Sequence, residues 1–98
     1  MAYRIYILKS DGTRMVTEQP KAPELEQLQA AVGGYIETIP YFTKFEGLKR
    51  GRAYCNEEGL VKGLPFNRDA TKAWREACPD GEESMMQLHG DVIFYAKV

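Results

Sequence analysis

The sequence is poor in the side chains on which most enzymes and metal sites depend. Its 98 residues include one histidine, His89, and two cysteines, Cys55 and Cys78. A structural zinc site needs four Cys or His ligands, so these three residues cannot complete one without a carboxylate or a second chain. His89 stands beside Gly90 and Asp91, which is typical of a strand end rather than of a base paired with a nucleophile. We therefore expect a non-enzymatic protein with no metal, cofactor or catalytic residue.

The sequence also lacks long apolar runs and an excess of charge. No run approaches the roughly 20 apolar residues that span a bilayer, and the first eight residues do not form a signal peptide. Thirteen Lys and Arg residues nearly balance fourteen Asp and Glu residues, for a net charge of −1. This balance argues against binding to duplex DNA, which favours a basic excess. We expect a cytoplasmic protein with reduced thiols and no membrane partner.

What is present is the composition of an ordinary globular domain. Apolar residues make up 44% of the chain and charged residues 28%, which argues against disorder of the whole chain. A chain of this length suffices for one domain with one modest core. No repeat, low-complexity tract or linker divides the sequence, so we expect a single domain over residues 1–98.

The first half of the sequence predicts a β-hairpin followed by a helix. Residues 3–8 alternate at period two, Ser10–Gly12 is a strong turn signal, and residues 13–17 form the return strand. Apolar residues then recur at helical spacing up to a Gly-Gly pair that suits a helix C-terminus: Leu25, Leu28, Val32 and Gly33–Gly34.

The second half predicts short strands, a second helix and a buried last strand. The short strands are expected at residues 35–39, 52–55 and 60–61, with a loop or ragged strand at 41–50. Asn67 is a good N-cap for a helix that ends at Pro79–Gly81, and residues 85–88 begin the approach to the last strand. Residues 91–98 are apolar on both faces, which predicts a central strand. The order ββαβββαβ predicts an α+β fold, with two helices packed on a small mixed or antiparallel sheet.

Two short segments supply the first candidate ligand contacts. Tyr35 and Glu37 follow the Gly-Gly pair and share one strand face, where they offer an aromatic platform beside a hydrogen-bond acceptor. Asn56 and Glu57 lie in a predicted tight turn and add polar groups. The alternative is that Glu37 is an ordinary carboxylate on the solvent side of a strand.

Asn67 and Arg68 form a candidate anion site at the start of the second helix. Free backbone N–H groups, the helix dipole and a guanidinium converge there. The alternative is a plain Asn N-cap followed by a surface Arg.

A basic and aromatic segment follows Pro40. The candidate partner-binding residues are Tyr41, Phe42, Phe45 and Arg50. Three further basic residues lie close to them in the sequence: Lys44, Lys49 and Arg52. Such a mixture can stack bases and contact phosphates, or it can anchor a protein partner. The alternative is a solvated loop with one or two aromatic rings in the core.

Four motifs together resemble a family of short proteins of unknown function from phages, plasmids and bacterial genomes. They are Val32–Glu37 (Val-Gly-Gly-Tyr-Ile-Glu), Asn56–Gly59 (Asn-Glu-Glu-Gly), Gly63–Asn67 (Gly-Leu-Pro-x-Asn) and Gly90–Val92 (Gly-Asp-Val). The resemblance covers nearly the whole chain and implies no established activity. It does imply a setting, because phages and mobile elements encode many small proteins that block host defence.

The expected function follows from the small size, the lack of catalytic groups and this resemblance. We expect a binding protein that counters host defence by sequestering a nucleotide-type signalling ligand, with a homodimer or higher oligomer forming the pocket. Direct inhibition of a host defence protein through the aromatic segment is the alternative. A small enzyme or a regulator of the element's own genes is a third hypothesis.

Overall fold

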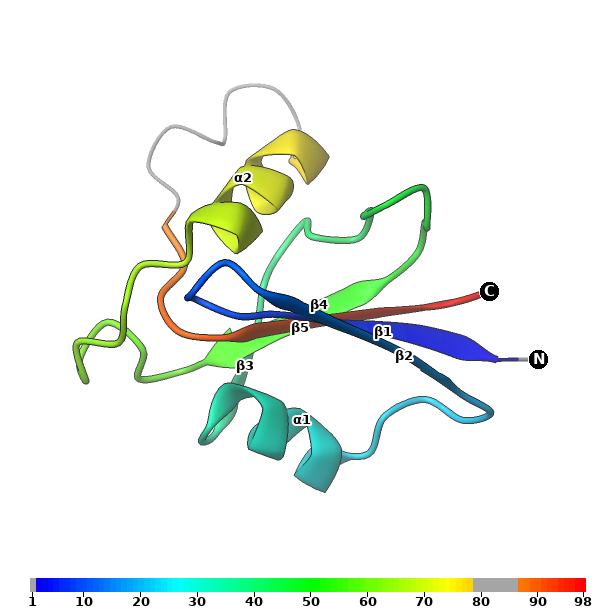
Figure 1. Cartoon of the computed structure of the whole chain (residues 1–98), viewed down its shortest axis with the longest axis horizontal. Coiled ribbons are helices and arrows are strands. Elements are labelled where there is room, and N and C mark those ends of the chain that lie inside the picture. Colours follow the sequence, from blue (N-terminus) through cyan, green and yellow to red (C-terminus); the bar gives the residue numbers. More distant parts are fainter. Residues whose placement is uncertain (1, 79–86) are drawn as a thin grey trace.

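The computed structural model describes residues 2–78 and 87–98, and within them the chain forms five strands and two helices (Figure 1). In chain order these elements are β1 (Tyr3–Leu8), β2 (Arg14–Gln19), α1 (Leu25–Val32), β3 (Ile36–Thr38), β4 (Arg52–Asn56), α2 (Arg68–Ala77) and β5 (Val92–Lys97). The predicted α+β class, with two helices packed on one sheet, is confirmed. The predicted helix end at Pro79–Gly81 and the start of the segment at residue 85 lie outside the described residues.

The sheet has the strand order β2-β1-β5-β4-β3, and every neighbouring pair is antiparallel. The predicted central position of the last strand is confirmed, because β5 lies between β1 and β4. Val92, Ile93 and Phe94 are all fully buried, as expected for a strand that is covered on both faces. The hairpin β1–β2 and the pair β4–β3 therefore join only through β5.

The two helices cover opposite faces of the sheet, as Figure 1 shows. On one face, Ile5 and Ile93 pack with Leu28 and Val32 of α1. On the other face, the larger cluster contains Trp74 of α2 and alternate residues of β1 and β5, among them Tyr6, Leu8, Val92 and Phe94. The period of two along each strand sends neighbouring side chains into different halves of the core.

Helix α1 ends as its sequence predicts but is less buried. Gly33 adopts a left-handed conformation with φ of 77°, and its N–H donates to the carbonyl oxygen of Gln29. Leu28 and Val32 are buried, whereas Leu25 is 57% exposed. Leu25, the first residue of α1, therefore lies outside the buried stripe in which its spacing placed it.

The predicted strand at residues 60–61 does not form. Its backbone continues the preceding turn, since Lys62 N donates to Glu58 O at 2.8 Å and Leu64 N donates to Gly59 O at 2.9 Å. Gly63 N also donates to Leu60 O at 3.1 Å, so local bonds hold the segment in a turn and use the Leu60 carbonyl oxygen that a strand would have offered to a neighbour. Leu60 and Val61 are consequently 75% and 86% exposed.

Candidate functional site

Asn67 is a structural residue and not a ligand contact. Its side chain is 1% exposed, and its Oδ1 accepts from Ala70 N at 3.0 Å, which makes it the N-cap of α2. Its Nδ2 donates to Leu8 O at 2.8 Å and to Gly90 O at 2.9 Å. Because both amide hydrogens and the oxygen are engaged, the expectation of a ligand contact at Asn67 is wrong, and the alternative of an ordinary N-cap is confirmed.

Asn56 is likewise used within the fold. It is 5% exposed, its Nδ2 donates to Val32 O at 3.2 Å, and its Oδ1 accepts from Glu58 N at 2.8 Å. A Cβ atom on Gly34 would lie 2.8 Å from that same Nδ2, so the second glycine of the Gly-Gly pair makes room for the amide. Asn56 thus ties the end of α1 to the turn after β4, and its role in ligand binding stays a prediction.

The structure brings together only part of the predicted ligand site. Glu37, Asn56 and Glu57 line one hollow of about 410 Å³ beside β3 and β4, whereas Arg68 lines a different hollow on α2, next to Phe66. Tyr35 is 67% exposed and lines neither. The hollow with the two glutamates has no Lys or Arg among its described lining residues, so it does not suit a phosphate.

Two reactive side chains of that same hollow are held in the fold. His89 Nδ1 lies 3.0 Å from Leu64 O, and its Nε2 is buried without a partner among the described residues. Burial, with a smaller effect from the charge of Glu37, raises the pKa of the Cys55 thiol to about 11. Cys55 is therefore a protonated core residue at neutral pH and not an activated nucleophile.

Two aromatic residues of the predicted partner patch lie in the core. Phe42 is fully buried and Phe45 is 8% exposed, whereas Tyr41 is 55% exposed and Arg50 is exposed. The ring centroids of Phe42 and Phe45 lie 5.4 and 5.6 Å from the ring centroid of Phe94. The expectation that they form an exposed patch is wrong, and the alternative, with aromatic rings from this loop in the core, is confirmed.

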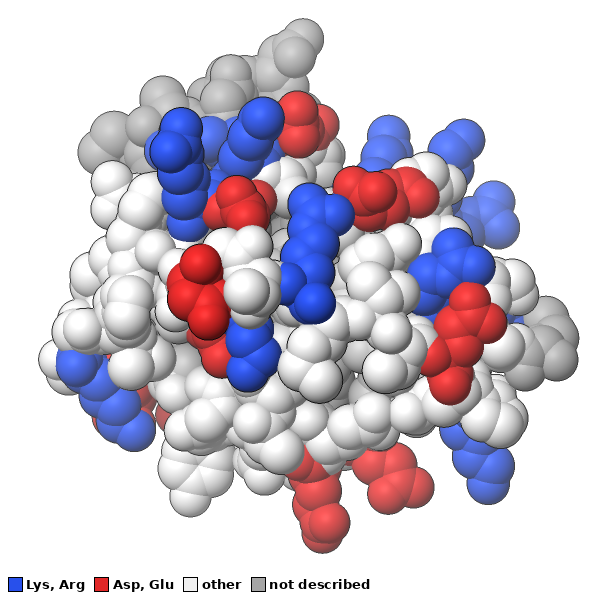
Figure 2. Space-filling model, viewed as in Figure 1, with Lys and Arg blue, Asp and Glu red and all other residues white. Residues whose placement is uncertain are grey.

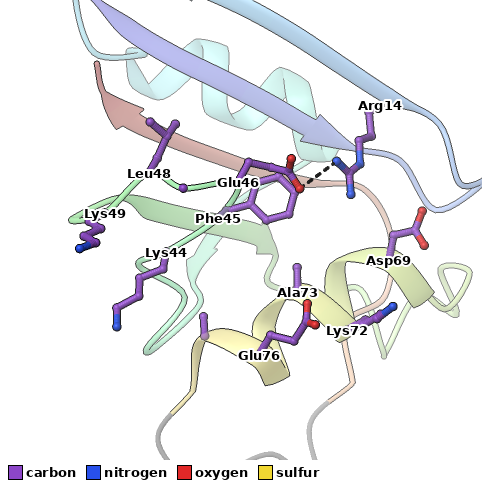
Figure 3. Close-up of a pocket in the computed structure, with 12 residues that line it drawn as sticks. Arg14, Lys44, Phe45, Glu46, Leu48, Lys49, Asp69, Lys72, Ala73 and Glu76 are labelled. Atoms are coloured by element: carbon purple, nitrogen blue, oxygen red, sulfur yellow. Dashed lines mark ion pairs between the residues drawn. The ribbon is translucent and has the colours of Figure 1, made fainter.

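This burial fixes the loop and turns its charges outward. In Figure 3 the ring of Phe45 lies between the sheet and α2, while Lys44 and Lys49 point away from it. Phe45 and Leu48 exchange two backbone hydrogen bonds of 3.0 and 2.9 Å, and Gly51 N donates to Thr43 O at 2.8 Å. The buried rings are therefore positioning residues for the basic side chains next to them.

The same loop holds three residues other than glycine in a left-handed conformation. They are Tyr41, Glu46 and Arg50, with φ of 66°, 51° and 57°. Each such residue costs on the order of 1–2 kcal/mol relative to a right-handed conformation. Backbone strain of this kind persists where the surrounding structure imposes it and is concentrated at functional sites.

The loop borders a basic hollow at one end of the sheet. The hollow, which we call the basic hollow, has a volume of about 850 Å³ and is lined by Lys49, Arg50, Arg52 and Lys97 together with Tyr3 and Tyr95. None of its described lining residues is Asp or Glu. Figure 2 shows Lys and Arg side chains, with acidic side chains beside them, at the upper right, where Figure 1 places this loop.

Strand pairing aligns the polar residues of this hollow on one face of the sheet. The register places Tyr3 opposite Lys97 and Arg52 opposite Tyr95, and directly opposed residues point to the same side. The rings of Tyr3 and Tyr95 lie 6.1 Å apart. Burial and the neighbouring Tyr54 raise the pKa of Tyr95, so its hydroxyl keeps its proton at neutral pH.

A second hollow, of about 490 Å³, lies between the loop and α2 but carries mixed charge (Figure 3). Its charged lining residues are Arg14, Lys44, Lys49 and Lys72, with Glu46, Asp69 and Glu76. Arg14 lies over the ring of Phe45 at 5.0 Å and pairs with Glu46 at 3.4 Å. Because the charges nearly cancel, this hollow favours an anion less than the basic hollow does.

Sequence reasoning found part of the basic hollow. Lys49, Arg50 and Arg52 belong to the basic segment singled out from the sequence, but Tyr3, Tyr95 and Lys97 were missed. No local signal marks the last three, because β5 comes to lie between β1 and β4 only through long-range pairing. The alternation of Tyr95 and Lys97 on one face of a strand is the one sign that was available.

The fold and the site define a small α+β protein with a basic hollow at the end of an antiparallel sheet. No metal cluster of three or more His, Cys, Asp or Glu side chains is found in the described ranges. The described helices are too short and too polar to cross a membrane.

The chain belongs to a family that is described as a domain of unknown function, DUF3846, whose family model matches residues 3–97. No curated protein and no solved structure matches the chain.

Proposed function

We propose that this chain is a non-enzymatic binding protein that takes up a phosphate-bearing, nucleotide-type ligand in the basic hollow. The observation that carries the proposal is the lining of this hollow, in which four cationic side chains meet two tyrosines and no carboxylate side chain of a described residue. Phosphate groups are recognised by such clusters of Lys and Arg, and bases stack on aromatic rings.

The arrangement assigns a role to each group. Arg52 and Lys97 extend from strand ends that the sheet holds in place, so they suit a fixed phosphate contact. Arg50 and Lys49 belong to the loop that Phe42 and Phe45 anchor, and they suit the open side of the ligand. Tyr3 and Tyr95 supply ring faces or edges and hydroxyl groups for the base or sugar.

The biological role that we attach to this binding is the sequestration of a signalling nucleotide in host defence. It rests on the resemblance to short phage and plasmid proteins and on the small size of the chain. A sequestering protein needs affinity and abundance but no turnover, which agrees with a site built from cations and tyrosines.

Native mass spectrometry with a panel of linear and cyclic nucleotides tests the proposal, followed by calorimetric titration of any ligand found. We expect a stoichiometric complex that Arg52→Gln weakens at least tenfold. Arg68→Gln and Lys21→Gln are matched controls, since each removes one exposed positive charge outside the basic hollow. Absence of binding by every nucleotide, or equal losses in the controls, would overturn it.

Direct inhibition of a host protein is the second candidate function, and the loop over residues 57–66 favours it. Leu60, Val61 and Phe66 are 75%, 86% and 45% exposed, and exposed apolar side chains can anchor a protein partner. Pull-down from a host lysate with the wild type and with Leu60→Asp/Val61→Asp tests this role. A partner retained equally by both proteins would exclude this loop as the anchor.

A further inference from the structure

The outer strand of the sheet leaves a long edge open. β2 lies at one end of the strand order, and each of its residues from Arg14 to Glu18 is exposed. Met15 and Val16, on opposite faces of the strand, are 49% and 52% exposed. The six residues of β2 include no proline and no lysine, which are common means of protecting an edge from pairing with another chain.

The hairpin determines which residues of β2 direct their backbone N–H and C=O groups toward β1 and which direct them outward. Lys9 N donates to Thr13 O at 2.9 Å, so this pair begins the ladder and every second pair after it is hydrogen-bonded. The register of β1 with β2 then directs the backbone groups of Met15 and Thr17 toward β1. The backbone N–H and C=O groups of Arg14, Val16 and Glu18 point outward, away from the sheet.

The outward groups allow one antiparallel pairing with a second copy in which opposite charges also face each other. If Val16 lies opposite Val16 of the second copy, Arg14 lies opposite Glu18 and Glu18 lies opposite Arg14. All three are then hydrogen-bonded pairs, and two of them join opposite charges. The registers that place Arg14 opposite Arg14, or Glu18 opposite Glu18, also pair the outward backbone groups, but they bring like charges together.

The existing ion pairs of these residues do not prevent the pairing. Glu18 pairs with Arg4 at 2.8 Å and Arg14 pairs with Glu46 at 3.4 Å, and all four side chains are well exposed. Exposed ion pairs of this kind contribute little and leave other donor and acceptor positions open. The opposite edge of the sheet is less suitable, because β3 has only three residues.

We propose that two copies of this chain associate through the outer edge of β2, antiparallel, with the two-fold axis at Val16. The two five-stranded sheets then form one continuous sheet. The contact buries Val16 against its counterpart and places Met15 beside Thr17 of the second copy on the opposite face. The interface is self-complementary, as a two-fold dimer requires.

Sedimentation equilibrium over a series of protein concentrations tests the association, with charge reversal as the probe. Arg14→Glu and Glu18→Arg should each weaken the dimer by about tenfold, because each opposes like charges at two symmetric positions. The double variant Arg14→Glu/Glu18→Arg should restore it. Within the chain, the double variant keeps the repulsion between Arg14→Glu and Glu46 and that between Glu18→Arg and Arg4. Restored association can therefore come only from pairing across the edge.

Disulfide cross-linking tests the register. The pair Met15 with Thr17 of the second copy is not hydrogen-bonded, which is the closer of the two antiparallel spacings. Met15→Cys/Thr17→Cys should therefore form a reducible dimer under mild oxidation, and Met15→Cys alone should not exceed the wild-type background from Cys78. A chain that stays monomeric at all concentrations, a double reversal that fails to restore association, or the absence of the cross-link would overturn the proposal.

Discussion

The Asn67 side chain at the start of α2 donates a 2.8 Å hydrogen bond to the carbonyl oxygen of Leu8 at the end of β1. The same amide reaches Gly90 before β5 and caps its own helix at Ala70. One buried side chain therefore joins three segments that are far apart in the sequence. Its conformation depends on all three, which is why it serves the fold and leaves no group for a ligand.

Asn67→Ala should lower the free energy of unfolding by about 2–4 kcal/mol, since it removes an N-cap and leaves two carbonyl oxygens without their donor. Urea denaturation measures the change. Gln27→Ala, which removes an exposed amide that bonds to Gln19, is the matched control and should cost about 0.5 kcal/mol or less. A loss below 1 kcal/mol at Asn67 would contradict the proposed joining role.

Gly51→Ala should be among the most destabilising single substitutions. A Cβ atom at this position would lie 2.3 Å from Phe94 Cζ and 2.9 Å from Tyr95 O, so both the core ring and the backbone of β5 would have to move. We expect a loss of about 2–3 kcal/mol in the free energy of unfolding. Gly47→Ala meets no atom within 4 Å but has φ of +80°, so it should cost only about 1 kcal/mol. Thermal unfolding measures both losses. If Gly51→Ala and Gly47→Ala lose the same stability, the close packing of Gly51 against β5 is not the cause.

Arg50→Gly should separate stability from binding. Arg50 has φ of 57°, which glycine adopts without steric cost, so the free energy of unfolding should stay level or rise by up to about 1 kcal/mol. If the basic hollow binds a nucleotide, the same variant should bind it more weakly, because a guanidinium is lost. Arg50→Ala is the control, since it loses the same charge and keeps the strained conformation. A lower free energy of unfolding in Arg50→Gly would contradict the inference that the left-handed conformation strains Arg50.

Cys55 should make the protein less stable at alkaline pH. Burial raises the pKa of its thiol from 9.0 to about 11 in the folded state, so between these values the unfolded chain loses the proton first. The free energy of unfolding therefore falls as the pH rises from about 9 to 11 and is unaffected below that window. Chemical denaturation at several pH values should show a flatter decline in Cys55→Ala. Cys78→Ser, at the less buried thiol, should keep the wild-type slope.

Much of the fold was predictable because its signals are local. The hairpin, both helices and the central last strand follow from turn residues, caps and periodicity within a few residues. The strand at residues 60–61 was predicted wrongly because Leu60 and Val61 look apolar enough to be buried, yet local hydrogen bonds hold that segment in a turn. Apolar character alone did not decide which residues were covered.

The site was less predictable because it depends on contacts between distant segments. Nothing in residues 41–50 shows a period, so the burial of Phe42 and Phe45 against Phe94 could not be read locally. Asn67 has the chemistry of a ligand contact, and only the fold shows that its amide groups are already used. The basic hollow exists because β5 brings Tyr95 and Lys97 between β1 and β4.

The central position of β5 also bears on how the chain folds during synthesis. The hairpin β1–β2 can form as soon as it leaves the ribosome, but β4 and β3 have no route into the same sheet until residues 92–97 emerge. Until then, both flanking strands β1 and β4 present open edges, and the apolar residues that β5 covers are exposed to water and to neighbouring chains. A nascent chain halted before β5 should therefore be protease-sensitive and depend on chaperones, and the addition of β5 should convert it to the native state in a single cooperative step.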